Sequence, residues 1–144
     1  MAGSLVTCMA IAAWLTGLPP DVLPAIHAVE GGKVGMATPN KDAAGRVVSE
    51  DLGVMQINSV AWLPALSAAM GTSRAEMRHS LVDDECFNVL AAGLIVKVYL
   101  AETHGDMEAA IGDYHSHTPI KRAEYQLKIA RAAMANAKGA APRS

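Results

Sequence analysis

The sequence predicts an all-α, mainly helical fold, and three features support this prediction. The chain has 144 residues, the size of one domain. Hydrophobic residues make up 51% and charged residues 18%, so enough apolar side chains are present to form a packed core. Aromatic residues are only 4% and much of the apolar content is alanine, which favours closely packed helices over stacked sheets. We therefore expect one helical domain over residues 1–144.

The first expected helix is the apolar run from Leu5 to Leu15. Eleven residues are too few to cross a bilayer core, which needs about 20. A signal peptide is not evident, because the first basic residue is Lys33 and Pro19-Pro20 stands where small residues would precede a cleavage site. We expect no transmembrane segment here: either these residues form a core helix or a leader has already been removed.

A second helix is predicted from near Asp21 to the pair Gly31-Gly32. The stretch from Gly31 to Leu52 shows no hydrophobic period, so it predicts a long loop that has room for a short hairpin, with strand signal only near Arg46 to Val48. Loops of this length are uncommon unless they are functional.

The remaining sequence predicts four or five further helices, each marked by local signals. Helical composition returns from Gln56 to Met70, and further starts are marked by the capping box Ser73 with Glu76, by Asp83-Asp84, by Asp106, and by Thr118 followed by Pro119. The helix after Asp83-Asp84 is expected over residues 86–102 and the one after Asp106 to about Tyr114. The domain core is expected at about 18–129, with a basic tail over 130–144.

Charge is unevenly distributed along the chain. Asp83 to Asp113 holds seven acidic residues and one basic residue, whereas Pro119 to Ser144 holds six basic residues and only Glu124. Tyr125 is the one aromatic residue among these bases, which is too few for interleaved base stacking, so we expect a solvated helix face rather than a nucleic-acid interface.

The two cysteines, Cys8 and Cys86, are 78 positions apart. This separation matches no zinc-ligand spacing. From the residues alone, a disulfide that closes a long loop and a pair of buried thiols are both open.

Glu30 is the most informative acid, because it stands at the end of a predicted helix, just before two glycines. The negative end of the helix dipole and burial against Ile26 and Val29 are expected to raise the pKa of its carboxyl group, as a general acid requires. The alternative is an exposed glutamate that pairs with His27.

Two later segments gather polar side chains. Asp51 to Asn58 contains Gln56 and Asn58, whose amides both donate and accept hydrogen bonds as sugar hydroxyls and N-acetyl groups require, although such residues also serve as plain helix caps. The segment from Asp113 to Pro119 contains His115 and His117. No further ligand stands at a helical spacing, so we expect no metal site, and Ser116 lacks the glycine-flanked elbow of a nucleophilic serine.

Taken in order, Glu30-Gly31-Gly32, Gly53-Val54-Met55-Gln56-Ile57-Asn58 and Tyr114-His115-Ser116 resemble the three motifs of the lytic transglycosylases with a goose-type lysozyme-like fold. The similarity extends from about residue 18 to 129 and is closest to the small specialised enzymes of type IV secretion, conjugation and pilus systems. Gly31 replaces the serine of the first motif, Val54 the leucine of the second, and Asp113 and His115 the alanine and asparagine of the third.

This resemblance implies cleavage of the β-1,4 bond between N-acetylmuramic acid and N-acetylglucosamine, with formation of a 1,6-anhydro ring. Glu30 would act as both acid and base, Asp51 as a helper or as the second carboxylate of a hydrolytic muramidase, and alternatively as a plain helix cap. The expected substrate-binding residues are Met55, Gln56, Asn58, Tyr114 and His115.

The resemblance also implies an exported, periplasmic protein that acts on peptidoglycan strands beside a secretion, conjugation or pilus apparatus, without metal or organic cofactor. In that oxidising compartment a Cys8 to Cys86 disulfide is favoured. A different class of function, a non-catalytic peptidoglycan-binding scaffold, stays open.

Overall fold

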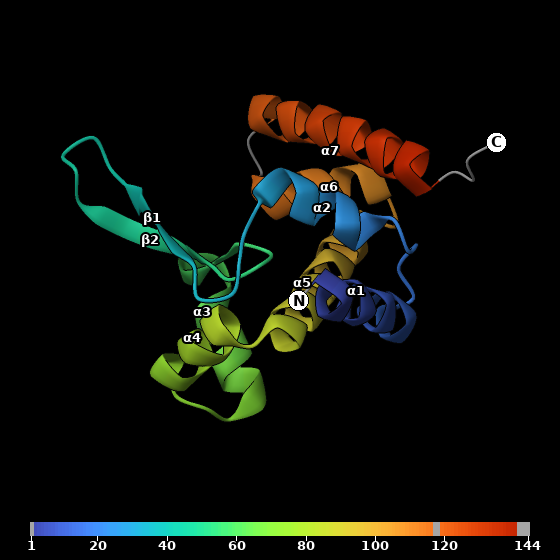
Figure 1. The fold of residues 1–144 in the computed structure, drawn as a ribbon. Helices are drawn as coiled ribbons and strands as arrows, with labels where there is room; N and C mark the ends of the chain where they lie inside the picture. The colour runs from blue at the N-terminus through green and yellow to red at the C-terminus, as the bar shows by residue number, and fades with distance from the viewer. Residues whose placement is uncertain (1, 117–118, 141–144) are drawn as a thin grey trace. The chain divides into compact units, whose positions relative to one another are not determined.

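The computed structural model describes residues 2–116 and 119–140, and it confirms a mainly helical fold. Within this part of the chain, 68% is helical, in seven helices accompanied by a small antiparallel sheet of three strands (Figure 1). The chain divides into two compact units, one formed by residues 1–29 and 90–144 and the other by Glu30–Val89.

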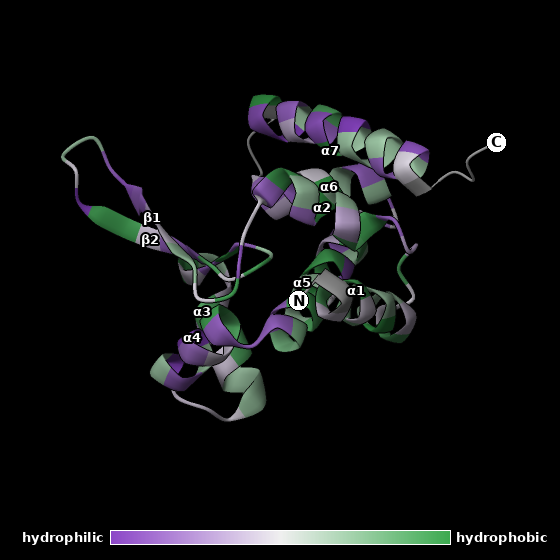
Figure 2. Cartoon of the chain, in the orientation of Figure 1, coloured by the Kyte–Doolittle hydropathy of each residue, from purple (hydrophilic) through white to green (hydrophobic). Residues whose placement is uncertain are grey.

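The first unit contains α1 (Ala2–Thr16), nearly all of α2 (Val22–Glu30), most of α5 (Glu85–Glu102), α6 (Met107–His115) and α7 (Pro119–Ala140). Helix α1 carries no charged residue and is white and green along its length in Figure 2. One side of it is buried through Met9, Ala12 and Ala13, whereas Ile11 and Trp14 are exposed. The predicted helix over Leu5 to Leu15 is therefore confirmed, and its buried side belongs to the core. No helix in the described residues has both the length and the apolar character needed to cross a membrane.

Helices α1, α2 and α5 meet at Gly93. A Cβ atom added at Gly93 would lie 3.2 Å from Cγ2 of Thr16, the last residue of α1, and 3.7 Å from Cδ1 of Leu23 in α2. The hydroxyl of Thr16 donates a hydrogen bond to the carbonyl of Ala12 at 2.7 Å, and this orientation directs its methyl group toward α5. Glycine at this position therefore permits the close approach that an alanine-rich composition predicted.

Helices α6 and α7 form an antiparallel pair. Gln126 in α7 donates a hydrogen bond to the carbonyl of Glu108 near the start of α6. Near the end of α6, Asp113 forms an ion pair with Arg122, close to the start of α7. Asp106 caps α6 by accepting from the amide of Ala109, as predicted. Thr118, the predicted cap of α7, lies outside the described residues, but α7 does begin at Pro119.

The second unit is built on the sheet β1 (Ala37–Lys41), β2 (Val47–Leu52) and β3 (Ile57–Asn58), in the order β1-β2-β3. The expected hairpin is present but longer than the strand signal near Arg46 to Val48 indicated. Its turn is held by Asp42, whose carboxylate accepts from the amides of Ala44 and Arg46.

Two helices complete this unit, α3 (Ser59–Met70) and α4 (Arg74–Asp83), and α5 begins in it. The capping box of Ser73 and Glu76 is confirmed, with both reciprocal hydrogen bonds present. Asp84 accepts from the amide of Phe87 in the first turn of α5, as the sequence predicted. The expected helix start at Gln56 is wrong: α3 begins at Ser59, after a turn and a short strand.

Candidate active site

The site begins at the end of α2, where Glu30 is half-buried and is followed at once by Gly31 and Gly32. Gly31 ends the helix in the left-handed conformation, with φ +66°. Gly32 lies directly against the second motif: a Cβ atom there would be 2.2 Å from the carbonyl oxygen of Gly53 and 2.5 Å from that of Val54. Two motifs that are about twenty residues apart in sequence are thus in backbone contact, and Glu30 stands two residues from that contact.

The second motif is a tight turn rather than the start of a helix. Gly53 has φ +69° and Gln56 has φ +53°, and the amide of Gln56 donates to the carbonyl of Gly53 at 3.1 Å. The side chain of Gln56 folds back, so that Nε2 donates to the carbonyls of Asp51 at 3.2 Å and Gly53 at 3.0 Å. Because both bonds use the amide nitrogen, Oε1 is the atom through which Gln56 can accept a hydrogen bond from a sugar hydroxyl.

The turn of the second motif is held by the side chain of Asn88, which lies near the start of α5. Its side chain is completely buried, accepts from the amide of Met55 at 2.9 Å, and donates to the carbonyls of Leu52 at 2.9 Å and Leu81 at 2.8 Å. Three backbone groups from two segments therefore depend on one amide. No local pattern singles out Asn88 in the sequence, because an asparagine inside an apolar helix is only a weak signal of a buried polar role.

Replacing Asn88 with alanine is expected to lower the free energy of unfolding by about 2–3 kcal/mol, because it leaves buried backbone groups without partners. The matched control is Asn136→Ala: Asn136 is also inside a helix but is exposed, so its replacement is expected to change stability little. Urea denaturation followed by circular dichroism measures both variants. Equal midpoints for the two variants would contradict the role assigned to Asn88.

Met55, an expected substrate contact, has a side chain with no exposed surface. It packs beneath the turn while its amide binds Asn88. Met55 therefore supports the turn, and its buried side chain is not placed to contact a sugar.

Asp51 lies on β2, half-buried, opposite Asn58 in the strand register. Its Oδ1 accepts from Nδ2 of Asn58 at 3.1 Å, and the same nitrogen reaches the hydroxyl of Ser49 at 3.2 Å. The interpretation of Asp51 as a helix cap is wrong, because Asn58 caps α3 through the amide of Ala61. Asn58 is thus both the cap, as expected for such a residue, and the orienting partner of the Asp51 carboxylate.

A second carboxylate, Glu50, points to the opposite face of β2, since successive strand residues alternate. Arg78 of α4 binds it through two nitrogens, at 3.0 Å and 2.8 Å. The hydrogen-bonded Arg78 guanidinium holds the pKa of the Glu50 carboxyl below its ordinary value. Glu50 therefore joins the sheet to α4. Asp51 is the β2 carboxylate that lies beside Asn58 of the second motif.

The third motif lies at the end of α6 in the first unit. Tyr114 is half-buried, and the exposed ring of His115 stacks on Tyr125 of α7 with centroids 4.7 Å apart and planes 6° from parallel. A Cβ atom at Gly112 would lie 2.1 Å from Cγ of Arg122, so glycine is needed where α7 crosses. Helix α7 thereby holds in place the last turn of α6, which carries Tyr114 and His115. His117 lies outside the described residues.

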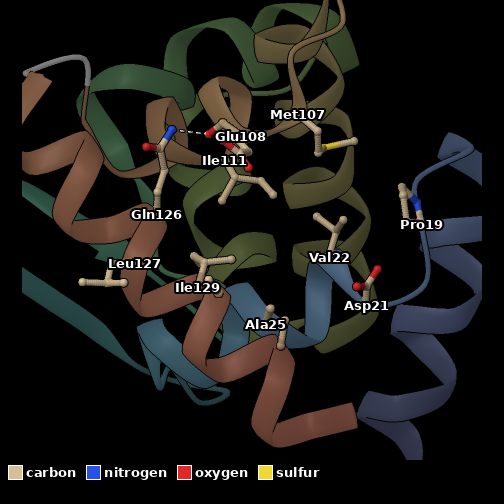
Figure 3. A pocket seen from close by; sticks show the side chains of 12 residues that line it. Pro19, Asp21, Val22, Ala25, Met107, Glu108, Ile111, Gln126, Leu127 and Ile129 are labelled. Carbon is tan, nitrogen blue, oxygen red and sulfur yellow. Dashed lines mark hydrogen bonds between the residues drawn. The ribbon is translucent and has the colours of Figure 1, made fainter.

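The first unit also contains a pocket of about 670 Å³ (Figure 3). Its walls come from the start of α2, from α6 and from α7, including Val22, Ile111 and Ile129. None of the predicted site residues lines it. In the described residues, no group of three or more His, Cys, Asp or Glu side chains is placed to hold a metal ion.

Cys8 and Cys86 are joined in a disulfide, which decides between the two alternatives that the sequence left open. Such a bond is consistent with an oxidising compartment. A comparison with protein-family models and a comparison with curated proteins each find no match to this chain.

Proposed function

We propose that this protein is a lytic transglycosylase that cleaves the β-1,4 bond between N-acetylmuramic acid and N-acetylglucosamine in peptidoglycan. The observation that carries the proposal is the contact of Gly32 with the carbonyls of Gly53 and Val54. It joins the segment after Glu30 to the turn that presents Gln56. A carboxyl group at a helix end, together with the amides of Gln56 and Asn58 and the carboxylate of Asp51, suits a sugar polymer, which offers many hydroxyl groups and few charges.

In the proposed reaction, Glu30 begins protonated and donates its proton to the glycosidic oxygen as the bond to C1 of the muramoyl residue breaks. The N-acetyl group of the substrate stabilises the positive charge at C1. The Glu30 carboxylate then takes the proton of the C6 hydroxyl while that oxygen bonds to C1. The products are a 1,6-anhydromuramoyl end and a free 4-hydroxyl on N-acetylglucosamine, with no water consumed and Glu30 protonated again.

The polar residues of the second and third motifs have separate roles in this proposal. Gln56 accepts from a sugar hydroxyl through Oε1, and Asn58 holds the Asp51 carboxylate in a fixed direction, where it stabilises the charge that develops on the sugar ring. Tyr114 and His115, which carry the third motif, are proposed to bind the sugars.

A hydrolytic muramidase is the second candidate, and the orientation of Asp51 by Asn58 favours it. An ordered carboxylate on β2 is suited to activating a water molecule or to bonding with C1, as the second carboxylate of a glycosidase does. The two candidates differ in their product, because hydrolysis leaves a reducing end that is 18 Da heavier than the anhydro end, the mass of one water.

Mass spectrometry of muropeptides released from purified sacculi tests the proposal. We expect anhydromuropeptides from the wild-type protein. Reducing-end products would replace the proposal with hydrolysis through Asp51. If nothing is released, a non-catalytic scaffold replaces it. The disulfide supports an exported protein acting in the periplasm, and we propose that it opens the wall locally for a secretion, conjugation or pilus apparatus.

A further inference from the structure

Helix α7 has a second apolar face that nothing in the described structure covers. Its first face packs on α6 through Tyr125 and Ile129, which are only 3% and 7% exposed. The second face presents large residues that are mostly open to solvent, with Ile120 at 73%, Leu127 at 54% and Met134 at 62% exposure. In Figure 3, Leu127 projects outward from α7, whereas Ile129 points toward α6 and α2.

The spacing of this second face is that of a coiled-coil seam. Its apolar residues recur alternately three and four positions apart, and all are exposed: Ile120, Ala123, Leu127, Ala130, Met134 and Ala137. This is the a and d pattern of a heptad, in which large residues occupy every a position and alanine every d position. A helix that only faced solvent would carry polar residues there. The pattern therefore indicates a partner helix of similar length.

We propose that a second copy of this chain supplies that helix, packed antiparallel along the seam. One register places every large residue opposite an alanine: Ile120 meets Ala137 of the second copy, Leu127 meets Ala130, and Met134 meets Ala123. Large side chains thus fill the space that small ones leave. A parallel pair would instead stack alanine on alanine in half of its layers and leave gaps there.

Charge on the edges of the seam supports the same register. Glu124, Arg131 and Lys138 each follow a seam alanine, so they lie along one edge, and Glu124 and Arg131 are exposed. In the antiparallel register this edge faces its equivalent, which brings Glu124 toward Arg131 of the second copy in two symmetric pairs. The opposite edge, with Gln126 and Ala133, carries no charge and continues into the pocket of Figure 3.

Sedimentation velocity of the full chain across a wide concentration range tests this proposal. We expect a reversible monomer–dimer equilibrium and, for Leu127→Glu, a dissociation constant at least about tenfold weaker. Leu127 is exposed, so this variant is expected to fold. The matched control is Ala135→Glu, which adds the same charge to an exposed position of α7 away from the seam and is expected to leave the equilibrium within about twofold. A monomer at every concentration, or equal weakening by both variants, would overturn the proposal.

Cysteine crosslinking then tests the orientation. Under oxidation, a mixture of Leu127→Cys and Ala130→Cys is expected to give a disulfide-linked dimer faster than either variant alone, because these positions are opposite each other only in the antiparallel register. Faster linking by Leu127→Cys alone would indicate a parallel pair and overturn the proposed arrangement. Neither experiment uses cleavage activity, so both are independent of the proposed enzyme function.

Discussion

Replacing Glu30 with glutamine is expected to reduce the release of anhydromuropeptides from purified sacculi by at least about a hundredfold. Glutamine has nearly the same shape as glutamate, but its amide can neither give a proton to the glycosidic oxygen nor remove one from the C6 hydroxyl. The proposed mechanism uses one carboxyl group for both transfers, so both are lost together. Binding to sacculi is expected to persist, because Gln56 and Asn58 are unchanged.

The chain offers a matched control in Glu102. It is the last residue of α5, as Glu30 is the last residue of α2, and it is exposed. The variant Glu102→Gln is expected to release muropeptides at the wild-type rate, and the two variants are expected to melt at similar temperatures. Activity of Glu30→Gln close to that of the wild type would remove Glu30 from the mechanism.

The features that could be predicted from the sequence are those that short-range interactions determine. The capping box at Ser73, the cap at Asp106 and the helix end at Gly31 each involve residues within a few positions of one another, so their signals are present in a short window. The same locality made the three motifs recognisable as a set. It also explains why the helical class could be predicted from alanine content and caps together.

The features that the sequence did not predict depend on distant partners. The sequence around Gln56 favours a helix, but its backbone takes φ +53°, because Asn88, 33 positions from Met55, binds the amide of Met55 and holds the chain in a turn. The strand β1 contains Pro39 and shows no alternation, and its pairing with β2 in a fixed register is what makes it a strand. Nothing within a few residues of Gln56 or Pro39 carries this information.

Asp51 shows the same limit at the candidate site. The resemblance implied a catalytic helper or a second carboxylate, and the alternative was a plain helix cap; these alternatives differ in which atoms contact the Asp51 carboxylate. The register between β2 and β3 sets Asp51 opposite Asn58, and this pairing assigns the cap to Asn58. The helper role of Asp51 in the proposed reaction therefore depends on a strand pairing that no local pattern predicts.

Replacing Gly32 with alanine is expected to lower the free energy of unfolding by at least about 4 kcal/mol. The added Cβ would lie 2.2 Å and 2.5 Å from the carbonyl oxygens of Gly53 and Val54, and both oxygens belong to backbone. No side-chain rotation relieves such a clash. The backbone of Gly53 cannot move away from Gly32 to relieve the clash, because it is itself closely packed: a Cβ added at Gly53 would lie 2.2 Å from the carbonyl oxygen of Leu81.

The neighbouring glycine separates this clash from backbone strain. Gly31 has φ +66° but no atom within 4 Å of an added Cβ, so Gly31→Ala is expected to cost only about 1 kcal/mol, the price of a left-handed alanine. Urea denaturation of both variants measures the difference. Under conditions where each variant is folded, only Gly32→Ala is expected to lose most of its muropeptide release, because it alone separates the end of α2 from the turn that presents Gln56. Equal stability and equal activity of the two variants would mean that the contact between the first two motifs is not what supports the candidate site.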